Sequence, residues 1–169
     1  MDFQALNIAI MTVSDSRTEA DDKSGNLLVD RLTKAGHALF EKTMVIDDIY
    51  QMRAVVSQWI ANPKVQAIIT TGGTGLTGRD VTPEAMKPLY DKEIDGFGEV
   101  FRQLSYGLIK TSTIQSRAVA GLANGTVIFT LPGSPGACKD GWDGIISHQL
   151  DATTQPCNLV EIMPRFLEK

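Results

Sequence analysis

The segment Val65–Glu84 reads VQAIITTGGTGLTGRDVTPE, and it joins an apolar run to a glycine-rich turn and a helix start. The apolar run, Val65–Thr71, is typical of a buried parallel strand. Glycines interrupt it from Gly72 to Gly75. In the following Thr82–Glu84, Thr82 is expected to cap a helix, Pro83 suits its first position and Glu84 favours its positive end. The segment therefore predicts a strand, a glycine turn and a helix, in that order.

The glycine turn also carries a possible binding function. Glycines have no Cβ, so they let backbone N–H groups approach a phosphate or a polar ring closely. Turns that follow the carboxyl ends of strands in open parallel sheets are where ligands bind. The glycines alone suit a plain chain reversal equally well. The charged pair Arg79–Asp80 in the same turn favours a binding site, because a chain reversal needs neither charge.

Apolar runs and helical periodicity predict further elements on both sides of this segment. Strands are expected at residues 6–13, 38–46 and 126–131, and helices at 24–35, around 52–60, from 82 onward, along 97–108 and from 138 to 149. Residues 110–117 are expected to form a loop, and the tail 151–169 has little periodicity. Alternating strands and helices predict a three-layer α/β/α domain with a doubly wound, mostly parallel sheet, formed by residues 1–169 as a single unit.

The composition limits the possible partners. The chain has 169 residues, of which 43% are hydrophobic and 21% charged, as in ordinary globular domains. Its formal net charge of −4 argues against nucleic acid as the main partner. No apolar run is long enough to cross a bilayer, and the first residues lack the basic region of a signal peptide. A cytoplasmic protein with no membrane partner is expected.

A GxGxxG pattern over Gly73–Gly78 raises the alternative of a dinucleotide-dependent oxidoreductase. That fingerprint must open a helix directly after the first strand of its unit. Here it follows the third predicted strand, and the helix start comes later, at Thr82. A P-loop is also disfavoured, because Arg79–Asp80 stands where Gly-Lys-Ser/Thr would be needed.

Histidine and cysteine chemistry has little support in the sequence. His37 and His148 lie near predicted helix ends and are expected at the surface, without partners for a catalytic triad or a zinc site. Cys138 is expected inside a helix as a small buried residue, and with Cys157 it forms no disulfide framework.

The carboxylates are more informative. Asp80 and one of the pair Asp47–Asp48 follow different predicted strands, so both can face one cleft. Two carboxylates beside a phosphate-binding turn suit a Mg²⁺-nucleotide site, since Mg²⁺ takes few protein oxygens and completes its shell with phosphate and water. The Asp47–Asp48 pair also suits a solvated turn. Ser134–Pro135 suits a helix N-cap with proline at the first helical position, and the same place suits an anion.

Four segments in order make the chain resemble a known family: TTGGTGLTGRDVTPE, GFGEVFRQLS, SRAVAG and LPGSP. They closely resemble the MoaB/MogA family of molybdenum cofactor biosynthesis proteins, to which the gephyrin G domain is related. The resemblance runs from about Ile8 to the last helix, and DATTQPCN looks more like the MoaB branch. It implies that molybdopterin and Mg-ATP give adenylylated molybdopterin and pyrophosphate. The alternative is a non-catalytic molybdopterin-binding or scaffold protein of the same pathway.

The resemblance also implies roles for particular residues. Asp80 matches the acid of the family's glycine loop and Asp48 the acid after the second strand, so both are expected to act in catalysis and to bind Mg²⁺; Asp47 remains the alternative to Asp48. The expected substrate-binding residues are Ser14, Asp15, Thr71, Gly72, Gly73, Thr74, Gly75, Arg79, Glu84, Ser105, Ser116, Arg117, Pro132, Gly133, Ser134 and Pro135. A homo-oligomer, hexameric rather than trimeric, and a downstream molybdate-insertion protein are expected as partners.

Overall fold

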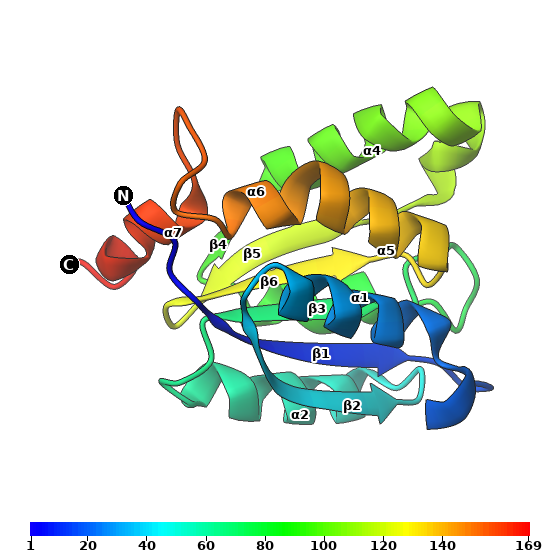
Figure 1. Ribbon diagram of the computed structural model, residues 1–169. Helices are drawn as coiled ribbons and strands as arrows, with labels where there is room; N and C mark the ends of the chain where they lie inside the picture. The colour runs from blue at the N-terminus through cyan, green and yellow to red at the C-terminus, as the bar shows by residue number, and fades with distance from the viewer.

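The computed structural model describes residues 1–169 and shows one six-stranded sheet between two layers of helices (Figure 1). The strand order is β2-β1-β3-β6-β5-β4. The strands are β1 (Asn7–Val13), β2 (Ala38–Val45), β3 (Ala67–Thr71), β4 (Lys92–Glu93), β5 (Val119–Ala123) and β6 (Thr126–Leu131). Strands β1, β2, β3 and β6 are parallel, whereas β4 and β5 are antiparallel to their neighbours. The predicted three-layer α/β/α fold with a mostly parallel sheet is confirmed.

Side chains of the strands contribute alternately to two separate hydrophobic cores, because successive residues of a strand point to opposite faces. Ile8 and Ile10 join one apolar cluster, and Ala9 and Met11 join the other. The first cluster is covered by α1 (Lys23–Lys34), α4 (Asp95–Ile109), α5 (Pro135–Gly141) and the π-helical segment Trp142–Ile146, which leads into α6 (Ser147–Gln149). The second is covered by α2 (Ile49–Ala61) and α3 (Thr82–Met86). Both faces of the sheet are thereby buried, as a parallel sheet requires.

The register places the carboxyl ends of the parallel strands at one edge of the sheet. Val13 of β1 pairs with Val45 of β2, while Thr71 of β3 pairs with Leu131 of β6. Strand β5 runs in the opposite direction, and its first residue, Val119, pairs with Thr130. The segment before β5 therefore arrives at the same edge as the segments that follow the parallel strands.

Strand β5 was not predicted from the sequence. Its residues, VAGLA, are mostly alanine and glycine, which have low strand propensity. Gly121 is needed in this strand because a side chain there would overlap the ring of Tyr90. The packing of that ring, and not the local sequence preference, explains the glycine.

The expectation that both histidines lie at the surface is wrong for His37. His37 is only 5% exposed, and its Nδ1 accepts a hydrogen bond from the backbone N–H of Leu6 at 3.2 Å. The ring also packs near Phe3 and Trp142. His37 thus ties the chain before β1 to the end of α1, a long-range contact that helical periodicity does not reveal.

The tail after α6 crosses back to the end of the sheet opposite the carboxyl ends of the parallel strands. Its short helix α7 (Leu159–Ile162) places Val160 in the core, and Leu167 lies beside Gly125 in the turn between β5 and β6. Figure 1 shows both chain termini at this end of the molecule. No helix has the length and apolar character needed to span a bilayer.

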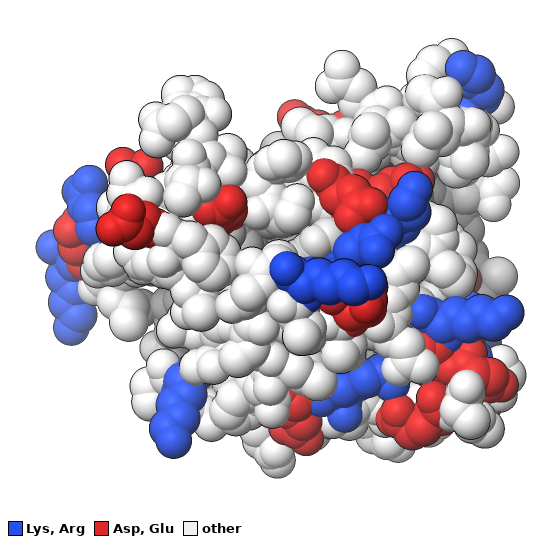
Figure 2. All heavy atoms as spheres, in the orientation of Figure 1, with Lys and Arg blue, Asp and Glu red and all other residues white.

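Charges of both signs are interspersed on the face that carries α1 and α5. Figure 2 shows Lys and Arg side chains next to Asp and Glu there, without a continuous basic area. One such pair is Arg31 with Asp143, whose Nε and Oδ1 atoms are 2.9 Å apart. This pair links α1 to the π-helical turn between α5 and α6.

Candidate active site

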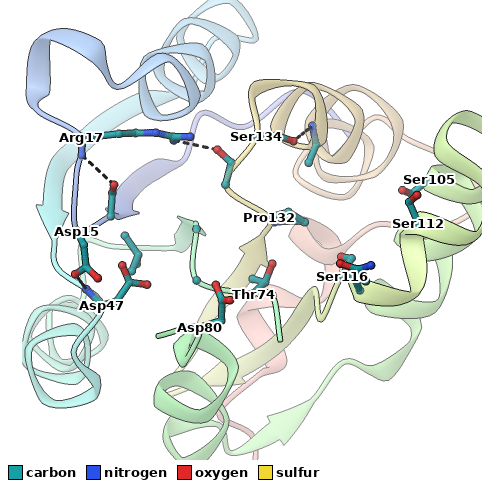
Figure 3. Close-up of a pocket in the computed structure, with 18 of the residues that line it drawn as sticks. Asp15, Arg17, Asp47, Thr74, Asp80, Ser105, Ser112, Ser116, Pro132 and Ser134 are labelled. Carbon is teal, nitrogen blue, oxygen red and sulfur yellow. Dashed lines mark hydrogen bonds between the residues drawn. The ribbon is translucent and has the colours of Figure 1, made fainter. Parts of the chain in front are cut away.

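A cavity of about 550 Å³ opens at the carboxyl edge of the parallel strands (Figure 3). It contains twelve of the residues expected from the sequence to bind substrate or catalyse the reaction. They are Ser14, Asp15, Gly72, Gly73, Thr74, Gly75, Asp80, Ser105, Ser116, Pro132, Gly133 and Ser134. The sheet register gathers these residues from segments far apart in the sequence.

The glycine turn after β3 forms the floor of the cavity. Gly72 and Gly73 have φ angles of +105° and +69°, a region that side chains rarely adopt. A Cβ at Gly72 would also overlap the carbonyl oxygen of Val13 at the end of β1. The hydroxyl of Thr82 donates to the Gly72 carbonyl at 2.8 Å, and Val81 is the N-cap of α3. The expectation that Thr82 caps this helix is therefore wrong: its hydroxyl fixes the turn.

Asp80 closes the same loop with its side chain in the cavity. Its Oδ2 accepts hydrogen bonds from the hydroxyl of Thr77 at 2.6 Å and from the backbone N–H of Thr77 at 3.0 Å. These hydrogen bonds hold the pKa of Asp80 below its ordinary value, and the bond from the Thr77 hydroxyl has the largest effect. The carboxylate is therefore charged and held in a fixed orientation at neutral pH.

Asp47 lines the cavity, whereas Asp48 does not. The Oδ1 of Asp48 accepts from the backbone N–H of Gln51 at 2.8 Å and so caps α2. The expectation that Asp48 faces the cleft is corrected to Asp47. The cap explains the difference, because α2 begins directly after Asp48 and uses its carboxylate at the helix end.

The electrostatic surroundings of Asp47 differ from those of Asp80. Two effects raise the pKa of Asp47 above its ordinary value: the larger is its partial burial, and the next is repulsion from the Asp15 carboxylate. Asp80 adds a smaller repulsion. Asp15 in turn forms a two-contact ion pair with Arg79, with both N–O distances at 2.8 Å, and this pair lowers the pKa of Asp15. The carboxylates thus concentrate negative charge beside the glycine turn.

Arg17 is the one Lys or Arg side chain among the residues that line the cavity. Its Nη1 donates to the carbonyl of Gly133 at 3.0 Å, and Ser24 donates to the same carbonyl at 2.7 Å. In Figure 3 the Arg17 side chain extends across the cavity wall towards the turn after β6. Sequence reasoning missed Arg17, although its place three residues after Ser14, at the end of the first strand, was an available signal.

The opposite side of the cavity is polar but uncharged. Figure 3 shows Ser105, Ser112 and Ser116 across from Asp15 and Asp47. Ser105 belongs to α4, and Ser112 lies in the 3₁₀ segment η3 (Lys110–Gln115), which was predicted as a loop. The other lining residues not predicted from the sequence are Val13, Ser16, Phe101, Ile109, Gln115 and Ala137. The antiparallel β5, itself unpredicted, begins at this edge of the sheet and so places the segment before it beside the cavity.

Comparisons with known proteins agree with this arrangement. Residues 9–152 match the family model described as a probable molybdopterin binding domain. Molybdenum cofactor biosynthesis protein B of Escherichia coli strain K12 is 55% identical over 157 residues, covering 93% of this chain and 92% of that protein. The chain belongs to the MoaB/MogA family of molybdenum cofactor biosynthesis proteins.

Solved structures of the family share the fold. A crystal structure of a molybdenum cofactor biosynthesis protein B matches with a TM-score of 0.84 and 42% identity, covering 87% of this chain and 92% of that one. The tungsten cofactor synthesizing protein MoaB from Pyrococcus furiosus matches with a TM-score of 0.79 and 38% identity, covering 86% and 92%. The MoaB/MogA fold is thus present over most of the chain.

Five residues expected from the family resemblance to bind substrate do not line the cavity: Thr71, Arg79, Glu84, Arg117 and Pro135. Thr71 is buried and donates to the Pro132 carbonyl at 2.9 Å, and Pro135 is the first residue of α5 after the N-cap Ser134. Arg79 pairs with Asp15, while Glu84 pairs with Arg117. These side chains bind other parts of the protein.

The cavity suits a metal ion that arrives with a ligand better than a resident one. No group of three or more His, Cys, Asp or Glu side chains is arranged to hold a metal ion. Asp47 and Asp80 nevertheless both line the cavity, where partial burial and then repulsion from Asp15 raise the pKa of Asp47. Mg²⁺ fits such a place, because one or two carboxylates suffice when phosphate oxygens and water supply its remaining ligands.

Proposed function

We propose that this protein catalyses the adenylylation of molybdopterin by Mg-ATP in molybdenum cofactor biosynthesis. The observation that supports this reaction best is the placement of Asp47 and Asp80 on either side of the glycine turn, inside one cavity. Membership of the MoaB/MogA family supports molybdopterin as the acceptor.

In this reaction a phosphate oxygen of molybdopterin attacks the α-phosphorus of ATP. A new P–O bond forms to that phosphorus, and its bond to the oxygen bridging to the β-phosphorus breaks, so pyrophosphate leaves with the electron pair. The attacking phosphate is already ionised at neutral pH, and no strong general base is needed. This chemistry agrees with a cavity lined by neither histidine nor cysteine. Rate enhancement then comes from positioning and from charge stabilisation.

The lining residues divide these tasks in the proposal. Asp47 and Asp80 would hold Mg²⁺, which supplies charge neutralisation on the triphosphate when bound. The Arg17 guanidinium, anchored on Gly133 through Nη1, retains N–H groups for a phosphate oxygen. The hydroxyls of Ser112 and Ser116 suit the neutral, hydrogen-bonding ring of a pterin.

The test is a product assay with purified protein, molybdopterin and Mg-ATP, comparing wild type with Asp80→Asn and Asp47→Asn. Each substitution removes a charge without changing the shape, so formation of adenylylated molybdopterin is expected to fall by about 100-fold or more.

Asp48→Asn is the matched control, because it neutralises the adjacent carboxylate. Its activity is expected to stay within about two-fold of wild type, since asparagine also caps helices well. A larger loss in Asp48→Asn than in Asp47→Asn would overturn the assignment of Asp47. Molybdopterin binding by the wild type without any adenylylated product would instead identify a non-catalytic binding protein of the pathway.

A further inference from the structure

Arg117 binds the glycine loop without lining the cavity. Its Nε donates to the carbonyl of Gly75 at 2.9 Å, and its Nη2 donates to the carbonyl of Asp80 at 2.8 Å. Its Nη1 contacts the carboxylate of Glu84 in the first turn of α3. The backbone N–H of Arg117 also donates to the carbonyl of Thr74 at 3.2 Å. One residue thus contacts the loop at its beginning, at its end and at the helix that follows.

These contacts fix the spacing of the loop ends. Gly75 and Asp80 begin and end the exposed part of the turn, where Leu76 is 68% exposed. The planar guanidinium presents its donors in a rigid fork, so it holds both carbonyls at a set separation. Lysine has a single ammonium on a flexible stem and does not reproduce this geometry. The orientation of the Asp80 main chain therefore depends on the guanidinium.

Arg117 directs its guanidinium to the protein and not into the cavity. Every nitrogen of its guanidinium already donates to the loop or to Glu84, and the side chain does not line the cavity. The Glu84 carboxylate balances its charge, and the hydrogen bond from Arg117 holds the pKa of Glu84 below its ordinary value. The family resemblance implied substrate binding by Arg117, and its geometry indicates another role.

We propose that Arg117 is a positioning residue, which holds the Asp80 carboxylate in its catalytic place by tying together the ends of the glycine loop. This inference rests on the proposed function of Asp80. Arg117 also joins the two sides of the cavity, because the preceding residue, Ser116, lines the uncharged side. The carboxylate side and the hydroxyl side are thereby held in one relative position.

The test compares wild type, Arg117→Ala and Arg117→Lys, with Arg31→Ala as the control. Arg31 also pairs with a carboxylate, Asp143, but on the surface away from the cavity. Arg117→Ala is expected to speed amide hydrogen exchange across residues 74–80 and to lower kcat by about 100-fold, as for a misplaced catalytic group. The KM for ATP and for molybdopterin is expected to stay near the wild-type value. Arg31→Ala is expected to change none of these quantities.

Rescue provides a second readout. Methylguanidinium added to Arg117→Ala is expected to restore part of kcat and to slow the exchange again, whereas Arg117→Lys is expected to remain impaired. If Arg117→Ala does not fold, Glu84→Ala replaces it, because it removes only the outer partner of the guanidinium. Glu84→Ala is expected to produce a smaller change of the same kind.

Two outcomes would overturn the proposal. Unchanged exchange in residues 74–80 together with a raised KM and normal kcat would show that Arg117 binds substrate. Unchanged exchange and unchanged kinetics would show that the loop does not need it. Hydrogen exchange is measured without substrate, so a failure of adenylylation in the wild type would reject the proposed function while exchange still tested the tie between Arg117 and the loop.

Discussion

At the scale of single residues, two aspartates that line the cavity have pKa values shifted in opposite directions. Asp80 is stabilised as a carboxylate by hydrogen bonds from Thr77. Asp47 is partly buried and lies near Asp15, so its charged form is disfavoured. Arg79 opposes this effect, because its guanidinium lowers the pKa of Asp47 through space as well as that of Asp15. The charge of Asp47 therefore depends on a residue outside the cavity.

Replacing Arg79 by alanine is expected to raise the pKa of Asp47 further, because the attraction is lost while the repulsion from Asp15 and Asp80 remains. If catalysis needs ionised Asp47, the acid limb of the pH profile of kcat/KM moves to higher pH in Arg79→Ala. The profile for the double variant Arg79→Ala with Asp47→Asn is expected to lack this shift. An acid limb at the same pH in Arg79→Ala and wild type would contradict the coupling.

The residues of the site also show what the sequence can reveal. Asp80 and the glycines were predicted because their spacing in one short segment has a direct chemical meaning. The choice between Asp47 and Asp48 depends on where α2 begins, and helical periodicity first becomes clear at Met52, three residues after its start at Ile49. Arg17 was missed because its role depends on Gly133, which is 116 residues away in the sequence.

At the scale of elements, the glycine turn after β3 lies against the ends of both β1 and β6. The N–H of Gly72 donates to the carbonyl of Leu131 at 3.0 Å, and a Cβ placed on Gly133 would lie 3.2 Å from the Gly72 Cα. The turns after β3 and β6 thus contact each other through backbone atoms, at Gly72 and Gly133. A side chain at Gly72 would overlap the Val13 carbonyl, and one at Gly133 would make a tight contact with Gly72.

Gly72→Ala is expected to destabilise the protein by about 2 kcal/mol, because alanine is strained at positive φ and its Cβ overlaps the Val13 carbonyl. Gly78→Ala is the control in the same loop, since nothing lies within 4 Å of a Cβ there and its φ is ordinary. Urea unfolding of both variants measures the difference. Equal stability of the two would contradict the requirement for glycine at position 72.

Elements with a strong apolar pattern were predicted well, and those defined by packing were not. The sequence TVIFTL predicts β6 with its observed bounds, Thr126–Leu131, because β-branched and apolar residues dominate it. Strand β5 lacks such a pattern, and β4 has only two residues, Lys92–Glu93. The missing β5 is why the uncharged side of the cavity was only partly predicted, through Ser105 and Ser116.

At the scale of the whole molecule, the homo-oligomer implied by the family remains a prediction. Large apolar side chains are exposed where α4 meets η3, including Leu108 at 60% and Ile114 at 75%. Exposed apolar groups of this kind are typical of interfaces between chains. Their position next to the cavity makes this region a candidate surface for self-association.

Analytical ultracentrifugation of the wild type is expected to give a mass several times that of one chain. The variant Leu108→Lys with Ile114→Lys is expected to sediment as a smaller species, because burying two ammonium groups at an interface is unfavourable. Replacement of Tyr50, which is 76% exposed on α2, by lysine is the control. A monomeric wild type would contradict the prediction, and dissociation only in the control would place the interface on α2.

The positions of the chain termini have a practical consequence for the study of this protein. Both lie at the end of the sheet opposite the cavity, where the tail packs near the turn between β5 and β6 (Figure 1). A fluorescent label, a surface tether or a second enzyme can be attached at either terminus without obstructing the mouth of the cavity. Molecules immobilised in this way would present the cavity to solution, so turnover measured on a tethered layer is comparable with turnover of the free protein.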